Sequence, residues 1–279
     1  MASPHLITVG DNVVDCYQAL ATMYPGGNCV NVAVFARRFG LESAYVGAVG
    51  DDVAGNLIAT SLDEEGVGTS LLRTVPGGKT AWCLIGHREG DRIFLGSDLG
   101  VSEFSPKQAD LAAIARADAV HIGASSHMDD WVEELSSRTR VSYDFSTYGD
   151  RQRIAAVAPR LWLATVSGGG LTDTEVVDLA GAITGAGAAW VLVTRGAAGA
   201  VLFHGSRQWL VAATPTNVVD TLGSGDTFLA RVLTGLLRHE DPPVFLAAAA
   251  EAAAATCGTV SAFGHPAPNT ITATQHSSH

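Results

Sequence analysis

The sequence predicts an α/β fold in which a mostly parallel central sheet is covered by helices on both faces. Strand-like apolar runs alternate with stretches of helical periodicity over most of the 279 residues. With 47% hydrophobic and 16% charged residues, the chain has enough apolar side chains for a large core. We therefore expect a single domain over residues 1–274, followed by a polar, disordered tail at 275–279.

The first expected strand, at 6–9, leads to a helix over about 30–39. A strand at 44–49 precedes a second helix, and later strands are expected at 119–122, 141–145, 161–166 and 191–193. Residues 217–219 have the character of a strand end. From Thr227 onward, apolar residues recur at the period of a helix that buries one face, so a helix is expected to open there.

One segment interrupts this alternation. Strand-like runs at 80–87 and 92–95 are joined by a turn that contains Gly90, which predicts a β-hairpin. The hairpin, at about 80–96, is either an edge of the main sheet or a separate lid over a site. The residues alone leave both interpretations open.

The charge and composition narrow the classes of partner. A formal net charge of −11 argues against nucleic acid and against an anionic membrane surface, because both require basic patches. The four cysteines show no CxxC spacing, and the N-terminus has no secretory signal pattern, so a cytoplasmic location is expected. The nine histidines show no HExxH pair, which gives a zinc hydrolase no support.

The segment from Asp220 to Asp226 joins the expected strand end to the expected helix through Gly223 and Gly225. Unpaired amides and the positive end of the helix dipole at this point favour an anion, and glycine lets the backbone approach it closely. Asp226 competes with a bound anion unless it has a proton to accept, which makes it a candidate general base. A glycine-rich turn with an ordinary first-turn acid explains the same residues.

Two further clusters carry polar groups suited to a sugar. Gly26-Gly27-Asn28 opens the first helix, where Asn28 is placed to cap it, and Asn31 follows three residues later on the same face. Asp11 and Asp15 come just after the first strand, at the end of an α/β sheet where ligands bind. Solvated turn residues and a simple helix cap are the alternatives.

The motif Asp220-Thr221-x-Gly223-Ser224-Gly225-Asp226 resembles the signature of the ribokinase (PfkB) family of carbohydrate and nucleoside kinases. The resemblance implies that Asp226 deprotonates the acceptor hydroxyl, that the amides of Gly223, Ser224 and Gly225 form an anion hole, and that Asp220 helps to hold a monovalent cation such as K⁺. It also implies a small β lid, used in some members for homodimer contacts.

The same resemblance extends from Gly10 to about Gly258 in family order. It assigns sugar binding to Asp11, Asp15, Gly26, Gly27, Asn28 and Asn31. It assigns ATP binding to Thr194, Gly196, Gly199, Thr221, Ala252 and Cys257.

One family motif is absent. The Asn-x-x-Glu that organises Mg²⁺ and phosphates in the family is replaced here by Ser167-Gly168-Gly169-Gly170 and the residues up to Glu175. Glu175 either supplies the missing acid or is an exposed helix residue. Mg²⁺ is nevertheless expected together with ATP.

The substrate is indicated by shorter stretches, among them Tyr143-Asp144-Phe145-Ser146 and the lid residue Arg92, which could contact substrate. These resemble the fructoselysine 6-kinase branch of the family, which implies phosphorylation of a fructosamine (an Amadori product) at O6. Fructokinase, ribokinase or nucleoside kinase activity is the alternative. A ribokinase-fold protein that binds without catalysis is the alternative of another class.

Overall fold

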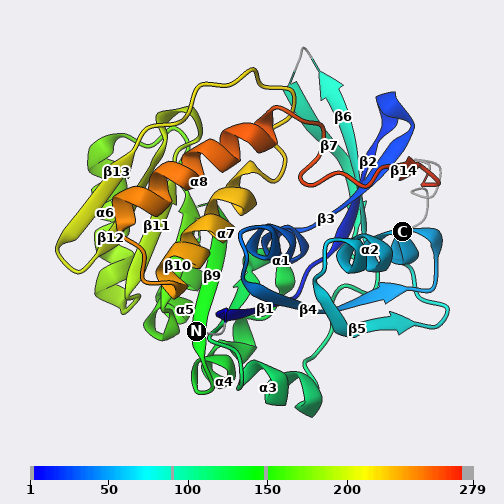
Figure 1. The fold of residues 1–279 in the computed structure, drawn as a ribbon, viewed down its shortest axis with the longest axis horizontal. Helices are drawn as coiled ribbons and strands as arrows, with labels where there is room; N and C mark the ends of the chain where they lie inside the picture. The colour runs from blue at the N-terminus through cyan, green and yellow to red at the C-terminus, as the bar shows by residue number, and fades with distance from the viewer. Residues whose placement is uncertain (1–2, 89–90, 148–149, 272–279) are drawn as a thin grey trace.

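The computed structural model describes residues 3–88, 91–147 and 150–271. A nine-stranded sheet runs through the molecule in the order β13-β12-β11-β10-β9-β8-β1-β4-β5 (Figure 1). In chain order its strands are β1 His5–Val9, β4 Glu42–Gly50, β5 Gly68–Val75, β8 Ala119–Gly123, β9 Arg140–Thr147, β10 Leu163–Ser167, β11 Trp190–Thr194, β12 Ala200–His204 and β13 Arg207–Val211.

The pairs from β5 to β11 are parallel, and β12 and β13 add an antiparallel edge. Helices lie between the strands in sequence: α1 Asn28–Arg38, α2 Val53–Glu64, α3 Gln108–Ile114, α4 Val132–Ser136, α5 Arg151–Val157, α6 Asp173–Ala186, α7 Ser224–Leu237 and α8 Pro242–Cys257. The predicted α/β class, a mostly parallel sheet covered by helices, is confirmed.

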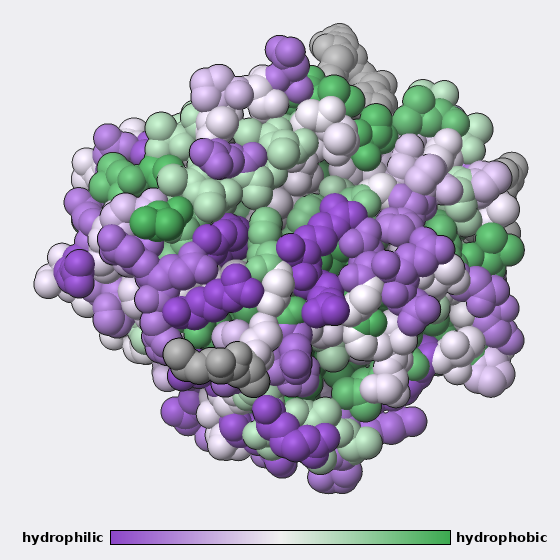
Figure 2. All heavy atoms as spheres, viewed as in Figure 1, coloured by the Kyte–Doolittle hydropathy of each residue, from purple (hydrophilic) through white to green (hydrophobic). Residues whose placement is uncertain are grey.

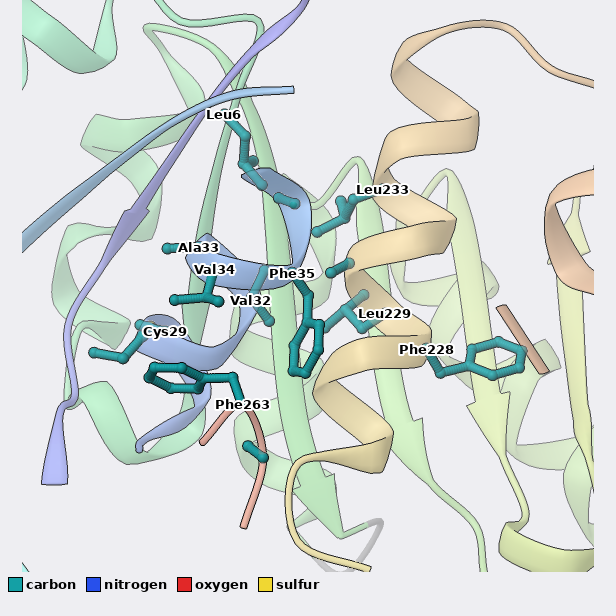
Figure 3. Packing of buried hydrophobic residues seen from close by; sticks show 14 of the residues in the cluster. Leu6, Cys29, Val32, Ala33, Val34, Phe35, Phe228, Leu229, Leu233 and Phe263 are labelled. Carbon is teal, nitrogen blue, oxygen red and sulfur yellow. The ribbon is translucent and has the colours of Figure 1, made fainter. Parts of the chain in front are cut away.

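Alternation along β1 divides the core between the two faces of the sheet. Leu6 packs into a cluster with α1, α7 and α8, whereas Ile7 and Val9 pack into a second cluster with α3 to α6. Figure 3 shows Phe35 of α1 directed toward Leu229 of α7, where the two helices pack together. This packing brings the N-terminal ends of α1 and α7 to the same edge of the sheet.

The predicted hairpin belongs to a second sheet rather than to an edge of the main one. Its strands are β6 Trp82–Arg88 and β7 Asp91–Asp98, in the order β14-β3-β2-β6-β7. The other members are β2 Val13–Tyr17, β3 Thr22–Gly26 and β14 Ala267–Pro268, none of which was predicted. Figure 1 shows this sheet next to α1 and α2. We call it the lid sheet, and its role as a lid stays a prediction.

Two local predictions were wrong. Residues 217–219 form no strand: Val218 and Val219 are 63% and 59% exposed, and the Val219 amide donates to the carbonyl of Cys257. Helix α7 begins at Ser224, three residues before Thr227, because Gly223 adopts a left-handed conformation (φ 76°) and serves as its N-cap. The predicted tail at 275–279 and the turn at Gly90 lie outside the described residues.

Within the described ranges, the helices are all too short or too polar to cross a membrane. Figure 2 shows hydrophilic side chains spread over much of the visible face, with a weakly hydrophobic strip over α8. That strip agrees with the composition of the helix, since α8 is largely alanine.

A glycine at the contact between α7 and α8 is expected to resist even the smallest substitution. A Cβ at Gly235 would lie 2.3 Å from Cγ of Phe245, so Gly235→Ala should destabilise the fold by about 1–3 kcal/mol despite its better helix propensity. At the exposed Gly181 of α6 a Cβ would meet open space, so Gly181→Ala should stabilise by about 0.5–1 kcal/mol. Denaturant unfolding measures both, and a neutral Gly235→Ala would contradict the packing argument.

Candidate active site

The first helix begins at a glycine that sequence reasoning did not identify as its cap. Gly27 is the N-cap of α1, with φ 103°, and a Cβ there would lie 2.8 Å from Cα of Asn12. The Asn28 amide instead donates to Oδ2 of Asp11, 2.8 Å away, which follows β1. The Asn28 side chain therefore does not cap the helix as predicted. The Asp11 carboxylate satisfies the backbone amide of Asn28, and the Asn28 side chain is left available for other contacts.

Two amide side chains of α1 hold the Asp226 carboxylate of α7. Nδ2 of Asn28 donates to Oδ1 over 2.8 Å, and Nδ2 of Asn31 donates to Oδ2 over 2.7 Å. Burial raises the pKa of Asp226 to about 6, although both amide hydrogen bonds lower it, and the Asp11 charge raises it further. A carboxyl with this pKa is ionised near neutral pH and is a better proton acceptor than an ordinary aspartate.

A second, half-buried carboxyl, Asp144 near the end of β9, shares the Asn28 side-chain amide. Its Oδ2 lies 3.1 Å from Nδ2 of Asn28, and its Oδ1 accepts from the Ser146 amide at 2.8 Å. Burial raises the pKa of Asp144 to about 7, followed in size by the charge of Asp226. One amide group thus bridges two acids that titrate near neutral pH.

The N-terminal turn of α7 has the donors that an anion needs. The Ser224 amide donates to Thr221 and the Thr227 amide to Gly223, whereas the amides of Gly225 and Asp226 have no acceptor among the described hydrogen bonds. Unpaired amides at the positive end of a helix form an anion-binding site. A Cβ at Gly223 would lie 2.3 Å from Cβ of Ala262, so this turn also requires its glycine.

Asp220 is tied to its surroundings by neutral donors. Its carboxylate accepts from the Tyr17 hydroxyl of the lid sheet, the Leu222 amide (3.0 Å) and the Ser261 amide (3.2 Å). These contacts fix the loop that precedes the anion site. The monovalent-cation role of Asp220 stays a prediction.

A cavity of about 210 Å³ joins the acid cluster to the predicted nucleotide loop. Its lining is polar and, among the described residues, contains neither lysine nor arginine. The lining residues are Asn28, Ala124, Ser125, Asp144, Ser146, Thr165, Ser167, Thr194, Gly225 and Asp226. One cavity is therefore lined by the candidate base Asp226 and by Gly225 of the anion site. It is also lined by Asn28 of the predicted sugar loop and Thr194 of the predicted nucleotide loop.

The predicted nucleotide loop follows β11, as expected. Gly196 (φ 56°) and Gly199 (φ 86°) both have backbone conformations that favour glycine, and a Cβ at Gly199 would lie 2.0 Å from the Val211 carbonyl oxygen. Ala252 and Cys257 lie on α8, and the Cys257 carbonyl accepts from the loop at 219–220. Thr221 is exposed beside the anion site.

The predicted sugar residues are divided between the two sheets. Asp11 follows β1 and accepts from Ser126 at 2.8 Å, whereas Asp15 lies within β2 of the lid sheet and not just beyond β1. A Cβ at Gly26 would lie 2.3 Å from Oδ2 of Asp15, so this carboxylate lies directly against the glycine. Arg92 is on β7, but its side chain lies outside the described part of the structure.

The predicted magnesium residue is engaged elsewhere. Glu175 and Thr172 form a capping box at the start of α6, with Glu175 Oε2 accepting from the Thr172 amide at 2.8 Å. Glu175 does not line the cavity of Asp226, and the described residues contain no cluster of three metal-ligating side chains. Its magnesium role stays a prediction.

Sequence reasoning missed three contributors, Asp144, His121 and Thr165. Asp144 stands near the carboxyl end of a predicted strand, a position typical of ligand-binding acids, and that position could have singled it out. No sequence pattern assigns a role to His121, but its ring lies 2.9 Å from Oδ1 of Asn28. Thr165 has a hydroxyl at the cavity wall that is buried and has no hydrogen-bond partner among the described residues, which no sequence pattern indicates.

Comparison with known proteins gives a consistent result. Residues 6–148 and 161–268 match the model of the pfkB family carbohydrate kinases. The chain is 38% identical over 267 residues to fructosamine kinase FrlD of Bacillus subtilis (strain 168), covering 94% of each chain. It is 34% identical over 232 residues to fructoselysine 6-kinase of Escherichia coli (strain K12), covering 82% of this chain and 88% of that one.

Among solved structures, the fold is similar to Arabidopsis thaliana ribokinase complexed with ribose and ATP. The TM-score is 0.81 at 22% identity, with 93% of this chain and 94% of that chain covered. This similarity confirms the predicted ribokinase-like fold.

The raised pKa of Asp144 predicts a stability effect that depends on pH. Because its folded pKa lies above the unfolded value, the folded state gains stability at low pH and loses it as pH rises through about 7. The loss runs from the unfolded pKa of about 3.9 to the folded value. Asp144→Asn, which stays neutral, should therefore stabilise the protein at pH 8 by about 1 kcal/mol, a rise in Tm of roughly 2 °C, and have little effect at pH 4. Asp178→Asn on the exposed face of α6 is the control, and an equal effect at both pH values would contradict the assignment.

Proposed function

Because the chain belongs to the pfkB family of carbohydrate kinases, which are ATP-dependent phosphotransferases, we propose that it phosphorylates a fructosamine. In this proposal the phosphate is transferred to O6, and Asp226 is the general base. Fructosamines are the proposed substrate because the two relatives above are named for kinases of fructosamine and fructoselysine and match this chain at 34–38% identity. Phosphorylation of a simple fructose is the alternative, since fructokinases also match at 27–28% identity, for example 28% for that of Klebsiella pneumoniae.

The arrangement of Asp226 carries the mechanistic part of this proposal. Its carboxylate lines the same cavity as Thr194 of the nucleotide loop, and it is held from both sides by amides of the predicted sugar residues. The helix amides beside it, at Gly225 and Asp226, have no acceptor among the described contacts. A base and an anion site are thus adjacent, as phosphoryl transfer requires.

When bound, ATP supplies the γ-phosphoryl group. In the proposed reaction a new bond forms between the acceptor oxygen and phosphorus, and the bond between phosphorus and the ADP oxygen breaks. The proton of the acceptor hydroxyl passes to the Asp226 carboxylate, while the α7 amides stabilise negative charge on the transferred group.

The remaining roles of the site are also proposals. Asp11, Asp15 and the two glycines before Asn28 are proposed to surround the sugar, with Arg92 of the lid nearby. Mg²⁺ is proposed to accompany ATP, and the hydroxyl-rich cavity wall at Thr165, Ser167 and Thr194 fits its hydrated shell or the phosphates it carries. A homodimer through the lid and a K⁺ ion at Asp220 remain predictions.

Removal of the base should stop turnover without preventing binding. Asp226→Asn keeps the shape of the side chain but cannot accept the proton, so kcat is expected to fall by about 10²–10⁴-fold. Calorimetric titration should show sugar and nucleotide binding close to wild type. The exposed Asp178→Asn serves as a control for the loss of one surface charge, and wild-type turnover by Asp226→Asn would exclude Asp226 as the base.

A coupled ADP-release assay tests the substrate. We expect the highest kcat/KM with fructoselysine or another fructosamine, and lower values with fructose, ribose and adenosine. Mass spectrometry or NMR of the product should locate the phosphate on O6. A preference for free fructose would establish the alternative, and the absence of turnover on the whole panel would support a protein that binds without catalysis.

A further inference from the structure

A fully buried histidine lies behind the acid cluster and contacts neither Asp226 nor Asp144 in the described hydrogen bonds. His121, on β8, is 0% exposed. Its Nε2 lies 2.9 Å from Oδ1 of Asn28, and its Nδ1 lies 3.1 Å from Oγ of Ser142 on β9. Ser142 is also 0% exposed, so its contact with His121 is shielded from water, whereas the contact with Asn28 is part-buried.

The chemistry of these atoms determines which of them carry protons. Burial lowers the pKa of His121 to about 3, so the ring is neutral and carries one N–H. The amide oxygen of Asn28 can only accept, and therefore Nε2 must donate to it. Nδ1 is then the acceptor, and the Ser142 hydroxyl donates to it. The Asn28 oxygen thereby selects the tautomer of His121, and the Ser142 hydroxyl supports it by donating to Nδ1.

This chain of hydrogen bonds also determines the orientation of the Asn28 amide. With the oxygen on His121, the NH₂ group faces Oδ1 of Asp226 at 2.8 Å and Oδ2 of Asp144 at 3.1 Å. Rotation of the amide by a half turn would place its oxygen against two carboxyl oxygens and its NH₂ group against the N–H of His121. The observed orientation satisfies every group in the chain.

We propose that His121, oriented by Ser142, is a positioning residue that directs the Asn28 amide toward Asp226 and so prepares the base for proton transfer. This inference rests on the proposed function. His121 acts through Asn28, since β8 places it beneath the site and its ring has no described contact with the cavity.

A specific consequence concerns the pH at which the enzyme becomes active. The Asn28 hydrogen bond favours the ionised form of Asp226, and the charged groups that face Asp226 are Asp11, after β1, and Asp144, on β9. If His121 no longer holds Asn28, the ionised form loses that support and the Asp226 pKa rises. Because the base must be ionised, the acid limb of kcat/KM then moves to higher pH.

The test compares two substitutions of similar bulk. His121→Leu removes both ring nitrogens, and we expect the acid limb of kcat/KM for the sugar to move up by about 1–2 pH units, as for loss of one hydrogen bond to a charged group. His121→Gln can still donate to Asn28, and it should restore a limb close to wild type. A wild-type limb in a folded His121→Leu enzyme, or equal shifts in both variants, would overturn the proposal.

A second kinetic comparison tests whether His121 acts through Asn28. In an Asn28→Ala background, His121→Leu should cause no further shift of the acid limb, because the amide that it orients is gone. Additive shifts would mean that the two residues act independently, and would overturn the proposal.

A measurement without turnover separates this inference from the proposed function and remains informative if His121→Leu does not fold. Nitrogen-15 NMR of the wild-type protein should show one histidine that stays neutral in the Nε2–H form from pH 5 to 8, and Ser142→Ala should perturb that signal. A protonated or Nδ1–H His121 would overturn the positioning role even in an active kinase. Failure on every sugar with the Nε2–H form intact would instead count against the proposed function alone.

Discussion

The partial burial of the Asp226 carboxylate is the constraint on which the rest of the site depends. A carboxylate taken out of water must be compensated by a cation or by hydrogen bonds. Here the compensation comes from the neutral amides of Asn28 and Asn31, one helical turn apart on α1. Those bonds require the N-terminal ends of α1 and α7 to meet, and the packing of Phe35 against α7 holds them there (Figure 3).

The same constraint explains why Asp11, Asp226 and Asp144 have different hydrogen-bond partners although they lie close together. Asp11 accepts from the Asn28 backbone amide and the Ser126 hydroxyl, and it sets the start of α1. Asp226 is held by two side-chain amides and faces the cavity, whereas Asp144 shares one of those amides. Because these hydrogen-bond donors are neutral, the negative charge of the carboxylates remains in the cavity. The positive end of the α7 dipole lies at the same cavity and opposes that charge.

The local parts of this site could be predicted from the sequence because they depend on near neighbours. Apolar periodicity predicted the sheet and its helices, and the glycines before Asn28 and Asp226 marked the two turns that are proposed to bind ligands. His121 and Asp144 were not predicted as site residues, since their roles arise from contacts with Asn28 over 93 and 116 positions. The strand β2 was missed because Val13–Tyr17 contains an acid at its centre, and that acid is buried only when β3 and β6 pair beside it.

The contact of Asp15 with Gly26 also bears on how such sequences can vary. The two residues lie on paired strands of the lid sheet, and the carboxylate occupies the space that a Cβ at position 26 would need. A longer side chain at position 26 is compatible only with a shorter or redirected one at position 15. The two positions therefore form a coupled pair, to be exchanged together in any library that varies this part of the lid sheet.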